Sequence, residues 1–106
     1  MTYEIALNAL GDPTRRLVFN RLCAGASSVA MLADGLPVSR PAVSQHLKIL
    51  KKAGLVIDDA VGARRVYRID RDGLTALRAW LDGLRGDALD AYQAEIQRQM
   101  DERRNT

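Results

Sequence analysis

The chain has 106 residues, of which 47% are hydrophobic and 27% are charged. This length suits one domain, and the composition excludes a disordered chain. No apolar run approaches the roughly 18 residues of a membrane span, residues 1–4 lack the features of a secretory signal, and a lone cysteine, Cys23, excludes an internal disulfide. We therefore expect a single domain over residues 1–106, located in the cytoplasm and not associated with a membrane.

The net charge of +3 is unevenly distributed along the chain. Residues 39–68 contain seven basic and two acidic residues, a net charge of +5, whereas the remaining residues together carry −2. A localised basic segment suits a polyanion, because neutralised phosphates release their condensed counterions. A solvated basic surface without a ligand explains the charge equally well. Sequence motifs are therefore needed to distinguish a polyanion-binding surface from a solvated one.

Two helices are expected at the start of the chain. The first covers about residues 3–10 and is ended by Gly11. Asp12 can then cap the free backbone amides of a second helix, and Pro13 fits its first position. This second helix is expected to run to about Ala24.

A helix-turn-helix is expected next. Ser27 or Ser28 starts a short third helix, and residues 35–38 interrupt the chain with a glycine and a proline. Ser39 then caps a fourth helix, which Gly54 closes. Two helices joined by a four-residue turn match the helix-turn-helix arrangement.

A β-hairpin and a long helix complete the predicted elements. Residues 55–57 and 66–69 are rich in β-branched side chains and predict two strands, with residues 58–63 as the loop between them. A helical period returns near Arg71, and two later glycines, which each cost about 1 kcal/mol in a helix interior, predict a bend or interruption in this helix. The expected fold is therefore mostly α, with about five helices, an elongated C-terminal helix and a small β-hairpin wing.

The fourth helix has two contrasting faces when it is drawn at about 100° per residue. Val43, Leu47 and Leu50 fall on the side that must face the core. The opposite side carries Pro41, Ser44, Gln45, Lys48 and Lys52, with Arg40 and Lys51 at its edge. No acid occurs in residues 39–57, and such hydroxyl, amide and cationic groups can contact bases and phosphates in a major groove. The alternative is an ordinary solvated helix face.

Four segments in order, residues 9–16, 39–48, 50–56 and 64–67, resemble the ArsR/SmtB family of winged-helix repressors. The resemblance implies a homodimer that is joined by the first and last helices and represses transcription. It also implies that the fourth helix enters the major groove of double-stranded DNA, while the hairpin wing contacts the flanking backbone or minor groove. The expected DNA-binding residues are Ser39, Arg40, Pro41, Ser44, Gln45, Lys48, Lys52, Arg64 and Arg65.

The dimer implied by the resemblance is expected to use apolar side chains of the terminal helices. These are Ile5, Leu77, Trp80, Leu81 and Leu84. The alternative is that this apolar stripe packs only within its own chain.

Metal sensing through a Cys-x-Cys pair in the third helix is known in the resembled family, but Ser28 and Ala30 stand at those positions here. The only histidine, His46, lies in the fourth helix, so neither a metal site nor a cofactor is expected. Cys23 is expected to be a small half-buried residue, and the alternative is a reactive thiol. The controlling signal is left open between an unknown small molecule, thiol oxidation and the concentration of the repressor itself.

Three other functions are alternatives to a repressor. An enzyme is disfavoured, because one histidine, one cysteine and no nucleophile–base pair offer little for catalysis. A winged-helix protein-interaction module is disfavoured by the acid-free face of the fourth helix. A DNA-binding protein that activates transcription, or does not repress it, stays open, because only the resemblance favours repression.

Overall fold

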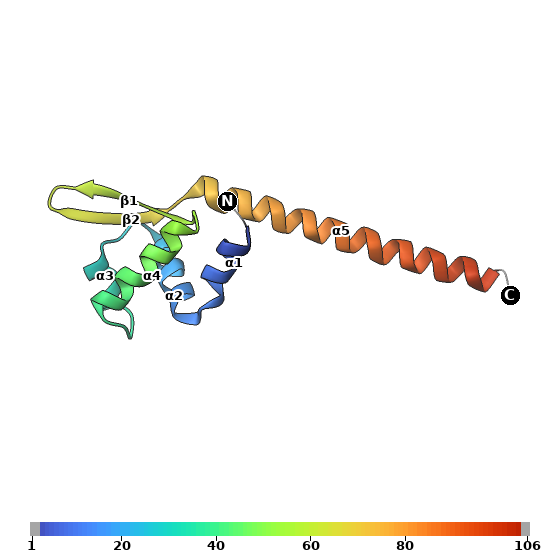
Figure 1. Cartoon of the computed structure of the whole chain (residues 1–106), viewed down its shortest axis with the longest axis horizontal. Coiled ribbons are helices and arrows are strands. Elements are labelled where there is room, and N and C mark those ends of the chain that lie inside the picture. The colour runs from blue at the N-terminus through green and yellow to red at the C-terminus, as the bar shows by residue number, and fades with distance from the viewer. Residues whose placement is uncertain (1–2, 105–106) are drawn as a thin grey trace.

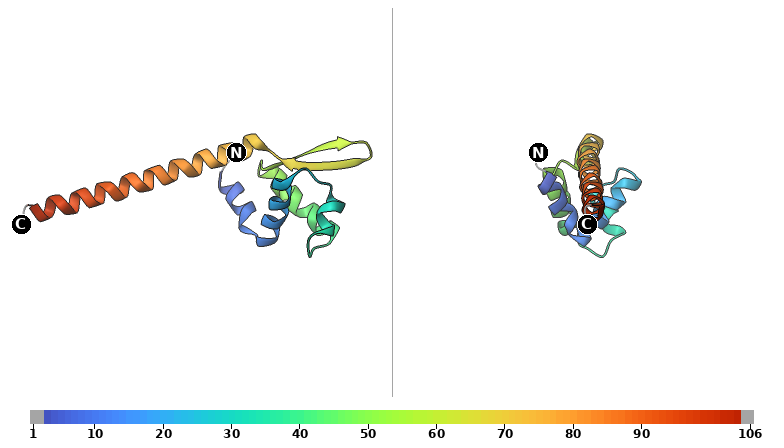
Figure 2. Two further views of the ribbon diagram at one scale, coloured as in Figure 1. Left: turned by 180° about the vertical axis from the view of Figure 1, so that it is seen from behind. Right: turned by 90° about the vertical axis from the view of Figure 1, so that its right-hand side faces the viewer.

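The computed structural model describes residues 3–104, which form five helices and one antiparallel hairpin (Figure 1). The elements are α1 (Tyr3–Gly11), α2 (Pro13–Ala24), α3 (Val29–Asp34), α4 (Arg40–Lys52), β1 (Val56–Val61), β2 (Arg64–Ile69) and α5 (Arg71–Arg104). The molecule measures 74 × 26 × 21 Å, because most of α5 extends away from the other elements (Figures 1 and 2). This arrangement confirms the expected fold class.

Side-chain caps position the starts of α2, α3 and α4. The side-chain oxygens of Asp12, Ser28 and Ser39 each accept a hydrogen bond from the backbone N–H three residues further on, at 2.9, 3.3 and 3.3 Å. Each bond satisfies an amide that has no partner within its own helix. The predicted helix starts are therefore confirmed, with Ser28 rather than Ser27 as the cap of α3. α1 includes Gly11, one residue beyond its predicted end.

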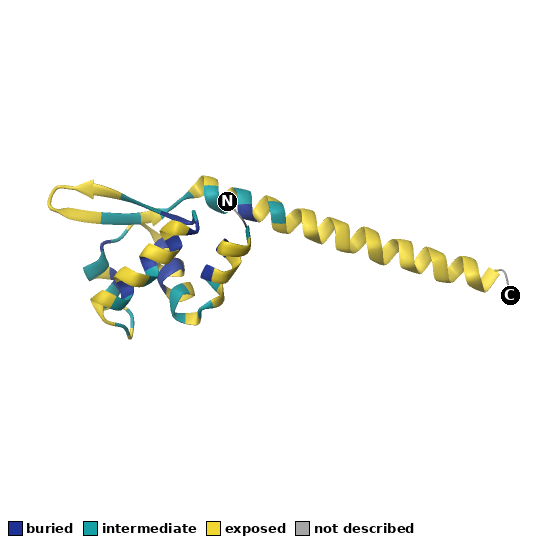
Figure 3. Cartoon of the chain, in the orientation of Figure 1, coloured by how far each residue is buried: buried dark blue, intermediate teal, exposed yellow. Residues whose placement is uncertain are grey.

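The core lies where α4 packs against α2, α3 and the start of the hairpin (Figure 3). Val43, Leu47 and Leu50 are fully buried, which confirms the inward face predicted for α4. Leu77, from the second turn of α5, is also buried in this cluster. The same side-chain spacing that buries one face of α4 leaves its opposite face in solvent.

The hairpin is longer than predicted. Residues 58–61 were expected in the loop but belong to β1, and the turn is reduced to Gly62 and Ala63. Gly62 has φ +63°, a conformation that hairpin turns favour for glycine. The acidic residues of β1 resemble turn formers in sequence, but in the folded hairpin they pair with arginines of β2, which extends the ladder.

Helix α5 is continuous for 34 residues, so the predicted interruption at Gly83 or Gly86 is wrong. The helix also shows no sharp bend along its length (Figures 1 and 2). Neither glycine has a neighbouring atom within 4 Å of where a Cβ would be, so no packing contact displaces the helix there. Gly73 is different, because a Cβ on it would lie 1.8 Å from the carbonyl oxygen of Gly54. This close approach seats the first turn of α5 against the end of α4. Within residues 3–104, no helix is both long and apolar enough to cross a membrane.

Candidate nucleic-acid interface

The outer face of α4 exposes the polar side chains that were predicted for it from the sequence. All seven residues predicted from this segment to bind DNA are exposed: Ser39, Arg40, Pro41, Ser44, Gln45, Lys48 and Lys52. Ile49 is 39% exposed and lies among them. The amide of Gln45 therefore stands between cationic side chains on one accessible helix face, a combination that can read a base edge while binding phosphates.

The wing contributes a second basic group beside α4. Arg64 and Arg65 are exposed on β2, and together with Arg40 they line a groove of about 430 Å³ between α3 and the hairpin. Asp34 is the only acidic side chain lining this groove within the described part of the chain. Within residues 3–104 the guanidinium groups of Arg40 and Arg64 form no ion pair, so they favour an anionic ligand in this groove, such as a phosphodiester backbone.

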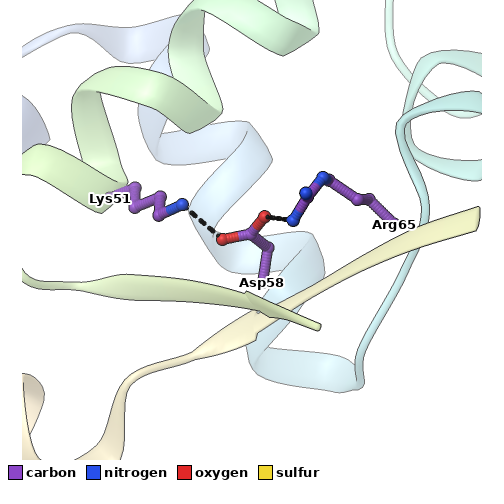
Figure 4. Close-up of polar contacts among 3 residues, drawn as sticks. All are labelled: Lys51, Asp58 and Arg65. Carbon is purple, nitrogen blue, oxygen red and sulfur yellow. Dashed lines mark hydrogen bonds and ion pairs between the residues drawn. The ribbon is translucent and has the colours of Figure 1, made fainter. Parts of the chain in front are cut away.

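One carboxylate joins α4 to the wing (Figure 4). The Oδ1 atom of Asp58 lies 2.6 Å from Nζ of Lys51 on α4, and its Oδ2 atom lies 2.5 Å from Nη1 of Arg65 on β2. The hydrogen bond from Lys51, with that from Arg65, holds the pKa of Asp58 below its ordinary value of 3.8. Sequence reasoning missed this contact. The contact could have been predicted from the spacing of the two aspartates and the arginines. That spacing places them on facing strands only if both strands extend as far as the turn.

The second carboxylate of the wing, Asp59, forms its ion pair on the other face of the hairpin. Asp59 Oδ2 accepts a hydrogen bond from Nε of Arg68 at 2.8 Å, and no residue of α4 takes part. Three of the seven basic residues in the segment 39–68 are therefore ion-paired with these two aspartates. Across residues 3–104, the members of this basic segment that form no ion pair are Arg40, Lys48, Lys52 and Arg64.

The residues predicted for a dimer interface differ in their exposure, since some are buried within the chain and others are exposed. Leu77 is only 3% exposed and is buried by its own chain. Trp80 is half-buried and packs against the core, while Ile5, Leu81 and Leu84 are exposed. Beyond them the apolar stripe of α5 continues through four exposed side chains that were not in the predicted set. These are Leu89, Tyr92, Ile96 and Met100.

The candidate sensor residues belong to different elements of the fold. Cys23 is exposed, so the expected half-buried position is wrong; it lies on the outer side of α2. Ser28, at the position of a family metal ligand, instead caps α3. No group of three or more potential metal-ligating side chains occurs in the part of the chain that the structure describes.

A short helix, a turn, an exposed polar helix and a basic hairpin beside it define a winged helix-turn-helix protein. Residues 12–58 match a family model described as "Bacterial regulatory protein, arsR family". The HTH-type transcriptional regulator Rv2034 of Mycobacterium tuberculosis is 52% identical over 97 residues, which cover 92% of this chain and 91% of that protein. The chain belongs to the arsR family of bacterial regulatory proteins, as the resemblance predicted.

Two further relatives broaden this comparison. The transcriptional repressor SdpR of Bacillus subtilis is 32% identical over 73 residues, covering 69% of this chain and 81% of that protein. A solved structure of the homodimeric winged helix-turn-helix DNA-binding domain Mb0332 from Mycobacterium bovis aligns with a TM-score of 0.65 and 25% identity, covering 82% of this chain and 81% of that one. The proteins similar to this chain therefore include a named transcriptional repressor and a homodimeric winged helix-turn-helix domain.

Proposed function

We propose that this protein is a sequence-specific DNA-binding repressor that acts as a homodimer on a palindromic operator. The main support for the proposal is the exposed, acid-free face of α4. On this face, Gln45 lies among basic side chains that form no ion pair within the described residues. Its family of regulators supports transcriptional control rather than catalysis, and action on a bacterial chromosome takes place in the cytoplasm.

Each exposed group has a distinct role in this proposal. Gln45 and Arg40 contact base edges, because an amide can pair with adenine and a guanidinium with guanine. Lys48, Lys52 and Arg64 are free of ion pairs and bind phosphates. The small or capping side chains Ser39, Pro41 and Ser44 allow the start of α4 to approach the groove closely, whereas Arg65 shares its charge with Asp58.

A second copy of the chain is proposed to cover the apolar surface of α1 and α5. Ile5 is 50% exposed, and Leu81 and Leu84 are 42% and 46% exposed. A helix that extends alone into water loses the packing that ordinarily stabilises long helices, so a partner helix is needed along this stripe. Two α4 helices related by the dimer axis would then read two half-sites about one DNA turn apart.

Selection of bound duplexes from a random pool tests the proposal. We expect enrichment of a two-fold symmetric site, with affinity that falls steeply as salt rises. If no palindromic site is enriched and all duplexes are bound with similar affinity, the protein is instead a non-specific DNA-binding protein. Absence of any salt-dependent duplex binding would favour a winged helix that binds proteins.

A further inference from the structure

Asp58 is the one wing carboxylate in the described chain that also bridges to α4. Its side chain is only 6% exposed, while the side chains of its partners Lys51 and Arg65 are 54% and 63% exposed. The carboxylate is therefore largely shielded from solvent, and each of its two oxygens faces one cation (Figure 4). Both cations remain close enough to solvent to reach a polyanion if Asp58 released them.

We propose that Asp58 is a specificity-determining positioning residue, which withholds Lys51 and Arg65 from DNA phosphates and holds the wing at a set angle to α4. This proposal rests on the proposed DNA-binding function. Each phosphate that a protein neutralises adds affinity for every duplex, whatever its sequence. Two cations whose charged groups are held by the Asp58 carboxylate are less available to phosphates, so base contacts from Gln45 and Arg40 make a larger share of the total affinity.

The fixed angle adds to this effect. Lys51 belongs to the last turn of α4 and Arg65 to the second strand, so one carboxylate ties together the two elements that would enter adjacent parts of the DNA surface. Without it, the wing would keep its own strand pairing but lose its polar link to α4. Loss of that link should broaden the range of duplex shapes that are bound.

The neighbouring residue supplies a matched control. Asp59 has the same chemistry and also pairs with an arginine of β2, but it lies on the opposite face of the hairpin and its side chain is 52% exposed. Asp58→Asn and Asp59→Asn each remove one negative charge from the same strand. A difference between them therefore reports the bridge to α4 and not the change in net charge.

The test measures the dissociation constant for the selected operator and for an unrelated duplex of equal length, over a range of salt concentrations. Asp58→Asn should bind the unrelated duplex about tenfold more tightly at low salt, with a salt slope steeper by about two, since each added phosphate contributes about 0.9. Its operator preference should fall by about tenfold. Asp59→Asn should steepen the slope by no more than about one and keep the operator preference. Equal behaviour of the two variants, or parallel weakening on both duplexes by Asp58→Asn, would overturn the proposal.

Adjacent lysines give a second test that leaves Asp58 in place. Lys51→Gln should lower the salt slope much less than Lys52→Gln, which should lower it by about one, because Asp58 holds the ammonium group of Lys51 away from phosphates. Equal losses for the two lysines would contradict the proposal, even if Asp58→Asn failed to fold. If the unaltered protein shows no salt-dependent binding to either duplex, the proposed function itself fails, and the two failures are thereby distinguished.

Discussion

The ring of Tyr3 on α1 lies parallel to the indole of Trp80 on α5, with centroids 5.1 Å apart and planes inclined by 6°. The stack fastens the two terminal helices of the same chain to one another. Trp80 therefore has a structural role within its own chain. The apolar residues that follow it along α5 stay exposed, and they are the surface that we propose a second copy covers.

Trp80 and Leu84 should consequently differ when each is replaced. Trp80→Ala should lower the free energy of unfolding by about 2–4 kcal/mol, because it removes a large packed aromatic side chain. Leu84→Asp should leave the fold intact and weaken the dimer by tenfold or more, because it places a charge on an exposed apolar stripe. Urea denaturation measures the first effect, and analytical ultracentrifugation measures the second.

Ala79→Asp is the matched control for the dimer experiment, since this exposed residue lies on the opposite side of α5. It introduces the same charge and should remain dimeric. A folded Leu84→Asp protein with wild-type dimer affinity would show that the stripe near Leu84 is not the interface.

Gln45 and Lys48 should separate the reading of sequence from general attraction to DNA. Gln45→Ala should cost about 1–3 kcal/mol mainly at one base position of the operator. Lys48→Ala should weaken all duplexes alike and reduce the salt slope by about one. Competition binding against single-base operator variants measures both effects. Uniform weakening by Gln45→Ala would mean that α4 is oriented differently in the groove.

Two glycines of α5 should respond in opposite directions to alanine. Gly73→Ala should destabilise the protein by about 1–3 kcal/mol, because the added methyl group would collide with the backbone oxygen of Gly54. Gly83→Ala has open space and should stabilise the helix by about 1 kcal/mol. Thermal and urea unfolding measure both changes. Equal shifts for the two variants would contradict the close approach at Gly73.

Acid should reduce the contribution of Asp58 to stability. Its pKa is lowered in the folded state by the hydrogen bond from Lys51, so its contribution is complete above the ordinary value of 3.8 and is lost as the pH falls through the lowered value. The difference in unfolding free energy between the unaltered protein and Asp58→Asn should therefore be largest near neutral pH and shrink below about pH 4. Some acid sensitivity should persist in the variant, because a backbone hydrogen bond from Arg15 also lowers the pKa of Asp12. A difference that stays constant across this range would contradict the assignment.

Operator binding should not respond to micromolar zinc, cadmium or arsenite. Each chain offers one thiol, Cys23, and one imidazole, His46, which belong to different helices. The measurement is an operator titration with and without each metal after chelator treatment. A tenfold loss of affinity, about 1.4 kcal/mol of coupling, that survives Cys23→Ser would reveal a metal site elsewhere.

Features that depend on neighbours along the chain could be predicted from the sequence alone. Asp12 and Ser39 begin helices because a short polar side chain can reach the next free amides, and this requires no distant contact. The two faces of α4 follow from helical geometry, so the burial of Leu47 and the exposure of Gln45 were both predictable.

Contacts between residues that are distant in the sequence became known only from the folded structure. The sequence shows Asp58 as a residue typical of turns, whereas folding pairs the strands and brings α4 alongside, so that the carboxylate binds Lys51 and Arg65. Trp80 likewise could have faced either a second copy or its own core, and the position of α1 assigns it to Tyr3. Such contacts depend on how separate elements pack against one another. Local sequence patterns predict the elements themselves but not the distances between them.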